Sequence, residues 1–299
     1  MGGVMLAFVT SLRHPRNAAD YGRVEELLRT TLGSLTAQTS DEYLVLVVGN
    51  QEPAFALPER VRFVPVGFPP PRAVDGPHAD RARFVRDKGS KIGVGLLAAR
   101  EAAPDHVMVV DADDFVHRDL AAFTARHRGH PGWVVDEGWV YSGARSAYRR
   151  QPAFHRTCGT CLVVPYDAYG VPDHLDETAS QDEVVAGFGD RLEHVLGAHR
   201  HAVEWFARHQ GRVLEPLPFR GAVYHVDTGE NHSGKRLRGL ARPLDADFAA
   251  CYGLPPVRRT TAALWSAVGP RAAAESALAF GRRAAGPLAR RVRGAVVRA

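Results

Sequence analysis

Three carboxylates stand close together at Asp111, Asp113 and Asp114, directly after the apolar run 107–110. Such a run predicts a buried strand, whose last residues reach the carboxyl edge of a sheet, where open α/β folds bind ligands. Carboxylates so close together repel one another unless a cation or hydrogen-bond donors compensate. Oxygen ligands favour Mg²⁺ or Mn²⁺, and Mg²⁺ is typically held by one or two carboxylates plus substrate phosphates. The alternative is an acidic turn in which Asp114 caps the next helix.

Two lysines precede this strand. Asp87 is expected to cap a helix that runs to about residue 102, which places Lys88 and Lys91 on one face of its first turn. A helix N-terminus with ammonium groups suits a diphosphate, because free backbone N–H groups and positive charge act together. The chain has only three lysines, and two of them are here. The alternative is a solvated helix face.

Apolar runs and helical patterns alternate around these residues. Strands are expected at 4–10, 43–48, 61–66 and 107–110, and helices at 20–36 and 87–102. Further along, strands are expected at 133–135, 139–141, 160–164, 213–216 and 222–226, and helices from near 181 and at 193–209. The alternation predicts an α/β, Rossmann-like fold with a mainly parallel central sheet flanked by helices.

Positive charge is concentrated at the C-terminal end. The net charge is +5, but residues 270–299 hold seven arginines and one acid, so the remainder is close to neutral. A nucleic-acid enzyme would carry its positive charge on the folded body, so no nucleic-acid partner is expected. We divide the chain into a main α/β domain, 1–255, and a helical Ala/Arg-rich tail, 256–299, broken at Gly286 and Pro287. The tail suits a peripheral contact with anionic lipid headgroups, a solvated helix or a partner subunit.

The composition is that of an ordinary globular protein, with 45% hydrophobic and 24% charged residues in a chain of 299. No apolar run is long enough to span a membrane, and the N-terminus lacks the basic start of a signal peptide. We therefore expect a cytoplasmic protein, at most peripheral at the inner face of the membrane. Cys158 and Cys161 have C-x-x-C spacing, but no second pair accompanies them, so the expectation is a structural feature rather than zinc.

The first strand, the second strand ending Val48-Gly49-Asn50, the basic helix start and the later D-x-D together resemble the glycosyltransferase A (GT-A) fold. Within it they are similar to the family-2-like nucleotide-sugar transferases, over about residues 4–235. The resemblance implies that Asp113 and Asp111 hold Mn²⁺ or Mg²⁺ and the donor sugar, with Asp114 in support. It places the nucleotide sugar against Thr10, Asn50, Asp87, Lys88, Lys91, Asp111, Asp113, Asn231 and Ser233.

The same resemblance implies a catalytic base near Ser180, where Asp182 and Glu183 begin a helix. A sugar hydroxyl is a poor nucleophile, and a positioned carboxylate contributes roughly 10²–10⁴ in rate. Asp182 is the first choice and Glu183 the second, and direct displacement would invert the anomeric centre. The alternative is that these acids merely suit the helix dipole.

Two further groups of residues complete the expected site. The polar loop after residue 224 resembles loops that close over the diphosphate or supply a metal ligand, with His225 and His232 as candidates and Asn231 and Ser233 as hydrogen-bonding partners. Trp139 and Tyr141 alternate on an expected strand and suit an acceptor platform, although core packing fits them equally well.

These observations predict a metal-dependent glycosyltransferase. It would move a sugar from a nucleoside-diphosphate sugar to a hydroxyl of a sugar, lipid-linked or small-molecule acceptor, in glycan, cell-surface polysaccharide or glycoconjugate synthesis. One alternative is a phosphohydrolase resembling the haloacid dehalogenases, which carry D-x-D after their first strand with Thr or Val two residues on, where this chain has Phe115. The other is a nucleotide- or carbohydrate-binding protein without catalysis.

Overall fold

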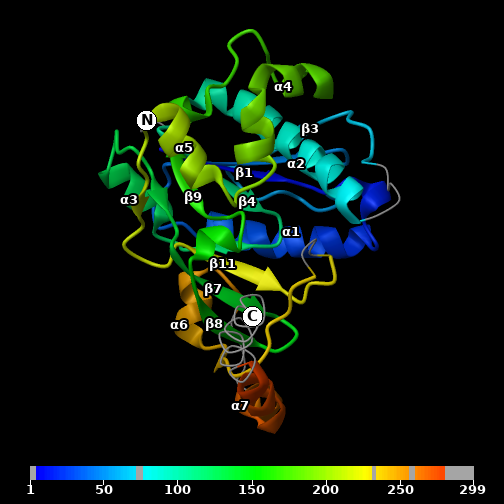
Figure 1. Ribbon diagram of the computed structural model, residues 1–299, viewed down its shortest axis with the longest axis vertical. Coiled ribbons are helices and arrows are strands. Elements are labelled where there is room, and N and C mark those ends of the chain that lie inside the picture. Colours follow the sequence, from blue (N-terminus) through cyan, green and yellow to red (C-terminus); the bar gives the residue numbers. More distant parts are fainter. Residues whose placement is uncertain (1–4, 72–76, 231–233, 256–259, 280–299) are drawn as a thin grey trace, which may run out of the picture.

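The computed structural model describes residues 5–71, 77–230, 234–255 and 260–279. Figure 1 shows a large α/β layer, a smaller sheet beneath it, and one helix at the far end. The large sheet has seven strands in the order β10-β6-β9-β4-β1-β2-β3. Their bounds are β1 Leu6–Ser11, β2 Tyr43–Gly49, β3 Val61–Pro65, β4 His106–Asp111, β6 Trp133–Val134, β9 Leu162–Pro165 and β10 Glu215–Pro216.

The centre of the large sheet is parallel. β1 pairs in parallel with both β2 and β4, and β2 with β3, whereas β9 runs antiparallel to β4 and β6. The register sets Ser11 beside Asp111, so β1 and β4 end side by side. The sheet is therefore mixed, and the predicted parallel part is its β3-β2-β1-β4 half.

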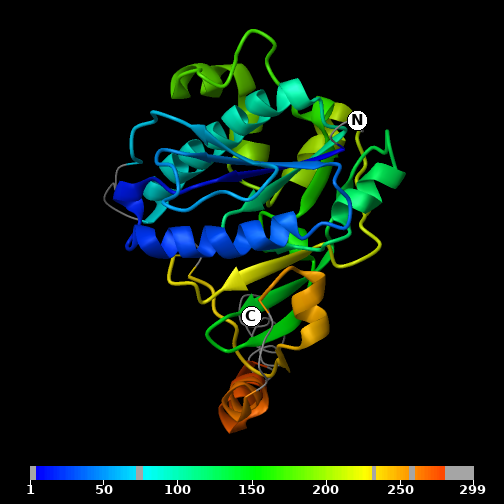
Figure 2. The same ribbon diagram turned by 180° about the vertical axis from the view of Figure 1, so that it is seen from behind.

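Helices cover both faces of this sheet. α2 (Pro77–Ala99), α4 (Gln181–Phe188) and α5 (Ala202–Gln210) lie above it in Figures 1 and 2, and α1 (Tyr21–Thr36) lies below, between the two sheets. Gly95 lets α2 approach β1 closely, because a Cβ there would stand 2.3 Å from a methyl of Val9. α3 (Leu120–Arg126) and the short helical turns η1 Pro15–Asn17, η2 Arg100–Ala102, η3 Phe154–Arg156, η4 Tyr166–Tyr169 and η5 Leu192–Leu196 complete this layer.

The smaller sheet has five strands in the order β12-β8-β7-β11-β5. Their bounds are β5 Phe115–Val116, β7 Glu137–Ser142, β8 Ala147–Pro152, β11 Ala222–Val226 and β12 Arg242–Pro243. α6 (Ala246–Cys251) packs on it, and Phe248 stacks on Tyr148 with ring centroids 4.0 Å apart. A second apolar cluster forms there, separate from the core of the large sheet. Because β5 follows the D-x-D turn directly, this sheet holds the turn from below.

α7 (Thr261–Val268) lies at the lower end of the molecule in Figure 1, against β8 and β12. The predicted boundary near residue 255 stays a prediction. The tail residues 280–299, with the expected kink at Gly286-Pro287, lie outside the described residues. Within the described ranges, no helix is both long and apolar enough to cross a membrane.

One predicted boundary is wrong. The helix expected to start at Asp87 begins at Pro77, so Asp87, Lys88 and Lys91 lie well inside α2. The first turn carries the free N–H groups of a helix, whereas interior N–H groups bond four residues back. The predicted diphosphate site at a helix N-terminus therefore does not exist at these lysines. Asp87, Lys88 and Lys91 can therefore contact a ligand only through their side chains, and not through free backbone N–H groups.

Candidate active site

A cavity of about 470 Å³ opens at the carboxyl ends of β1 and β4. Its walls come from residues 11–13 at the end of β1, from α2, and from the turn at 111–113. The wall is completed by the segments 156–159 and 197–200 and by the single residues Val24, Leu27, Tyr224, Glu230 and Lys235. Segments far apart in the sequence thus meet where the parallel strands end, which is where ligands bind in open α/β sheets.

Charged side chains of both signs line the wall, together with apolar ones such as Leu12, Leu27 and Phe84. Six cationic side chains line it, namely Arg13, Arg81, Lys88, Arg156, Arg200 and Lys235. Four acidic ones face them: Asp87, Asp111, Asp113 and Glu230. All three lysines of the chain lie at or next to this cavity. Lys88 and Lys235 line it, and Lys91 is buried behind the wall, paired with Asp87. A wall of this composition suits an anion together with a cation.

The D-x-D carboxylates differ in their partners. Asp111 forms an ion pair with Lys88, and although burial opposes ionisation, this pairing holds the pKa of Asp111 below its usual value. Burial and then the charge of Asp111 raise the pKa of Asp113 to about 7. A cation placed between the two carboxylates would relieve that repulsion.

Asp114 is fully buried beneath this pair. It accepts hydrogen bonds from Thr160 Oγ1 at 2.6 Å, from Cys158 Sγ at 2.9 Å and from the backbone N–H of His225 at 3.0 Å. Thr160 Oγ1 in turn accepts from the N–H of Asp111 at 2.9 Å. Burial and the neighbouring carboxylates raise the pKa of Asp114 well above its usual value. Asp114 therefore ties β11 and the segment before β9 to the D-x-D turn.

Gly159 allows the segment after η3 to approach the D-x-D. A Cβ at this position would stand 2.8 Å from Asp111 Oδ2 and 3.2 Å from Lys88 Nζ. Any side chain here would therefore push on the Asp111–Lys88 pair.

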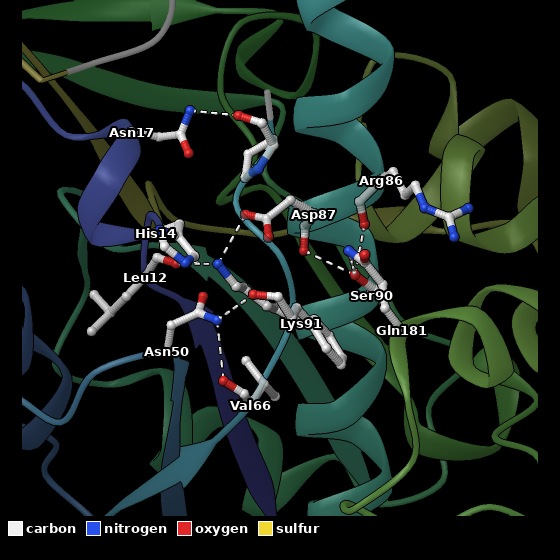
Figure 3. A network of polar contacts seen from close by, with 12 residues as sticks. Leu12, His14, Asn17, Asn50, Val66, Arg86, Asp87, Ser90, Lys91 and Gln181 are labelled. Atoms are coloured by element: carbon white, nitrogen blue, oxygen red, sulfur yellow. Dashed lines mark hydrogen bonds and ion pairs between the residues drawn. The ribbon is translucent and has the colours of Figure 1, made fainter. Parts of the chain in front are cut away.

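Figure 3 shows a network of polar contacts, here called the floor, that meets the cavity wall at Leu12 and Asp87. Lys91 Nζ donates to Asp87 Oδ2 and to the carbonyl of Leu12, both at 2.9 Å. Burial lowers the pKa of Lys91, against the charge of Asp87. The two lysines thus have different places: Lys88 lines the cavity, and Lys91 fixes α2 to the end of β1.

Thr10 and Asn50 lie near this floor but do not line the cavity. Asn50 Nδ2 donates to the carbonyls of Val66 and Phe68, at 3.1 and 2.8 Å, which fixes the chain after β3 (Figure 3). Thr10 Oγ1 and Asn50 Oδ1 are buried, without a hydrogen-bond partner among the described residues.

The donor set fits a divalent cation held jointly with a ligand. Among the described residues, no group of three or more His, Cys, Asp or Glu side chains is arranged to hold a metal. Asp111 and Asp113 nevertheless face the same cavity, and Mg²⁺ is commonly held by one or two carboxylates plus substrate phosphates. His225 lies behind the turn, with Nδ1 3.2 Å from the carbonyl oxygen of Asp113. The other predicted ligand, His232, and its neighbours Asn231 and Ser233 lie outside the described residues.

The predicted base residues lie elsewhere. Glu183 completes a capping box, accepting from the backbone N–H and hydroxyl of Ser180 at 2.8 and 2.6 Å. The Asp182 side chain is 90% exposed and pairs with Arg86. Neither lines the cavity. The arrangement of Glu183 matches the alternative in which an acid stabilises the helix start.

Trp139 and Tyr141, the predicted acceptor platform, lie on β7 in the smaller sheet. The Trp139 ring meets Tyr148 edge-on at 5.1 Å, and Tyr141 lies 5.1 Å from the ring of His225. Both pack on the cluster around α6 and do not line the cavity. Their alternation in the sequence reflects this packed sheet.

Sequence reasoning missed several wall residues, because single arginines and histidines carry no pattern. His199 lines the cavity, and burial and the charge of Lys88 lower its pKa to about 4, so the imidazole is neutral at pH 7. Glu230 accepts from Arg13 Nη1 at 2.8 Å and from the N–H of Asp20 at 2.9 Å, tying the loop after β11 to the loop after β1. Arg156, Arg200 and Lys235 were missed as well. The polar loop after β11 was the one available signal.

Comparison with solved structures finds distant matches. TarS of S. aureus matches with 12% identity and a TM-score of 0.37, over 74% of this chain and 37% of that one. A Desulfovibrio desulfuricans protein described as a nucleotide-diphospho-sugar transferase matches with 11% identity and a TM-score of 0.31, over 74% of this chain and 80% of that one. The glycosyltransferase GlyE of Streptococcus pneumoniae matches with 11% identity and a TM-score of 0.31, over 72% of this chain and 45% of that one.

The chain thus spans little more than a third of the length of TarS. No protein-family profile matches it, and no curated protein matches it by sequence. The matching structures include a glycosyltransferase and a protein described as a nucleotide-diphospho-sugar transferase, all at TM-scores of 0.37 or lower.

Proposed function

We propose that the protein is a metal-dependent glycosyltransferase that uses a nucleoside-diphosphate sugar as its donor. The observation that supports this most directly is the pair Asp111 and Asp113 at the end of β4, facing six cationic side chains across one cavity. The cavity volume of about 470 Å³ lies within the usual range for small-molecule sites. A diphosphate and a divalent cation together would satisfy both signs of charge.

The wall residues bind and orient the donor in this proposal. Lys88 and Lys235 supply compact point charges for phosphate oxygens, and the arginines can bind them with two parallel hydrogen bonds. Asp111 and Asp113 would hold Mn²⁺ or Mg²⁺, which when bound supplies positive charge for the departing diphosphate. Lys88 already contacts Asp111, so it can serve the carboxylate and a phosphate together. Thr10 and Asn50 would act indirectly, by shaping the floor.

The acceptor hydroxyl needs a group that takes its proton. His199 lines the cavity, and an imidazole nitrogen can accept a proton, so we infer that it takes this one. Burial and the charge of Lys88 make it a weak base, and the negative charge of a bound diphosphate would offset Lys88 and raise the pKa of His199. The earlier candidate, Asp182, would have to approach from outside the cavity. Attack on the anomeric carbon from the side opposite the diphosphate would invert the configuration. We propose that the acceptor is a sugar, a lipid-linked sugar or a small molecule. The reaction would then belong to the synthesis of a glycan, a cell-surface polysaccharide or a glycoconjugate.

Calorimetric titration with UDP-, GDP- and dTDP-sugars, with and without Mn²⁺, tests the proposal. We expect one nucleotide to bind more tightly with Mn²⁺, and Asp113→Asn to lose that gain because it removes a charge beside the cation. Asp41→Asn is the matched control, since that side chain is 87% exposed and does not line the cavity. A nucleotide affinity that changes neither on adding Mn²⁺ nor in Asp113→Asn would overturn the proposal of a metal-dependent site.

Product analysis then separates the enzyme classes. Slow release of free sugar and nucleoside diphosphate from the donor, without acceptor, is expected of a transferase. Release of inorganic phosphate from simple phosphate esters would instead support the phosphohydrolase alternative. Tight donor binding with no turnover under any acceptor would support a binding protein.

A further inference from the structure

Exposed apolar side chains gather at one end of the molecule. Six large hydrophobic residues are exposed among those that the structure describes. Five belong to the α7 end, namely Leu240, Leu264, Trp265, Val268 and Leu278, and the sixth, Val213, precedes β10. Trp265 is 70% exposed, which is unusual for the largest apolar side chain. We call these five residues the α7 patch.

The α7 patch rests on a fixed support. α7 buries Ala267 toward the body and turns Leu264, Trp265 and Val268 outward on adjoining positions of the helix. The Arg145 guanidinium donates to the carbonyls of Leu237 and Gly239, at 2.7 and 2.9 Å. These bonds hold the chain just before Leu240.

The next helical segment, 270–279, is tied to the same chain. The backbone N–H of Gly239 donates to Glu275, and that of Leu240 donates to Ser276 Oγ, both at 2.8 Å. Leu240 therefore lies beside the segment that carries Leu278. The patch is thus built from two parts of the chain held in place, at the far end of the molecule (Figures 1 and 2).

Positive charge accompanies the patch. Arg238, Arg242 and Arg271 are exposed around it. The sequence after it, 280–299, contains six arginines and no acid. Apolar side chains beside clustered arginines complement a surface with an anionic face and an apolar interior.

We propose that the α7 patch docks on an anionic lipid bilayer. Trp is favoured at the membrane interface, where its ring is apolar and its N–H stays solvated. Leu264, Val268 and Leu278 would enter the boundary between headgroups and acyl chains, while the arginines contact headgroups. A second copy of the chain is a poorer partner, because a two-fold contact sets the same arginines against each other. The proposal is independent of the glycosyltransferase activity.

Vesicle sedimentation with the full chain tests this proposal. We expect binding to vesicles of phosphatidylcholine mixed with phosphatidylglycerol, little binding to phosphatidylcholine alone, and loss as salt rises, because charge is screened over about 10 Å at 0.1 M. Trp265→Ala should weaken binding about tenfold, since burying one large apolar side chain changes an equilibrium constant by that order. Val213→Ala is the matched control, because Val213 is 72% exposed but away from the patch.

Tryptophan fluorescence provides a second readout. A blue shift on adding anionic vesicles, absent in Trp265→Phe while sedimentation persists, would place this ring at the interface. No binding to anionic vesicles, or equal loss in Val213→Ala and Trp265→Ala, would overturn the proposal. Light scattering that shows a dimer without lipid, broken by Trp265→Ala, would make a second copy the partner and would overturn it too.

Discussion

Two acidic turns of this chain look alike in sequence and differ in structure. In one, Asp111 to Asp114 follow β4. In the other, Asp182 and Glu183 open α4. The first is enclosed, and its carboxylates depend on Lys88, Thr160 and other fixed partners. The second is exposed, and its carboxylates pair with a surface arginine and cap their own helix. The enclosed turn is the one suited to binding a charged ligand, because water weakens charge interactions at the exposed turn.

The largest contrast between the turns is expected from Asp113→Asn and Asp182→Asn. The first should nearly abolish Mn²⁺-dependent donor binding, whereas the second should leave it unchanged. Asp113 faces Asp111 in the cavity, and Asp182 faces solvent. Parallel calorimetric titrations with the preferred donor measure both effects. Equal losses in the two variants would remove the distinction between the turns.

The next contrast concerns turnover. We expect His199→Gln to lower turnover by about 10²-fold with donor binding retained, because a proton acceptor acts in the transition state. His201→Gln is the matched control, since that histidine is exposed two residues away. Asp182→Asn should change turnover only a few-fold, which steady-state rates will show. A 10²-fold loss in Asp182→Asn with an active His199→Gln would instead restore the base predicted from the sequence.

Gly159→Ala should have an intermediate effect. The added methyl would crowd Asp111 Oδ2 and Lys88 Nζ, so the carboxylate must move. We expect donor affinity to fall by about tenfold, a loss of roughly 1.4 kcal/mol. Gly129→Ala serves as a control for the substitution itself, because that glycine has open space around it, although its positive φ of 70° adds some backbone strain. Unchanged affinity in Gly159→Ala would show that the Asp111–Lys88 pair shifts freely.

The smallest contrast is in stability. Thr160→Val removes the hydroxyl that bridges the Asp111 N–H and Asp114, and leaving buried groups unpaired costs about 1–3 kcal/mol. Ser180→Ala removes a cap at the exposed turn and should cost about 1 kcal/mol. Denaturant unfolding measures both. Only Thr160→Val should also weaken donor binding. Weaker donor binding in Ser180→Ala would contradict the distinction between the two turns.

The sequence predicts the first half of the large sheet well. β1, β2, β4 and α1 are apolar runs or amphipathic patterns, and each lies within a few residues of its expected place. Their burial on one or both faces leaves a clear periodicity. The predicted start of α2 was wrong because Asp87 has the residue type of a helix cap. In the structure Asp87 pairs with Lys91, which also binds the carbonyl of Leu12 after β1, and this contact leaves no local sequence pattern.

The cavity wall was predictable only in part. Asp111, Asp113, Lys88 and Asp87 line it, and all four follow from local patterns. Arg13 and His199 come from loops that tertiary structure brings together, so no local pattern marks them, whereas Glu230 lies in the polar loop after β11 that the sequence did single out. The smaller sheet was missed as a unit. The hairpin partner of β7, β8, was not expected, β5 and β12 have only two residues each, and β11 joins β5 and β7 across long intervals of sequence. Trp139 and Tyr141 therefore looked available to a ligand when they are packed in that sheet.

The cysteines beside the D-x-D offer a way to measure how often the site opens, through their rate of alkylation. Cys158 and Cys161 are buried, and burial raises the pKa of both thiols, so alkylating reagents should meet only Cys251 in the closed protein. Cys158 forms part of the cavity wall, and its thiol is held by Asp114. Its labelling rate would then report how often the segment at 158–161 parts from β4. A donor that occupies the cavity would slow that rate without any need for turnover, giving a view of site opening that activity assays lack.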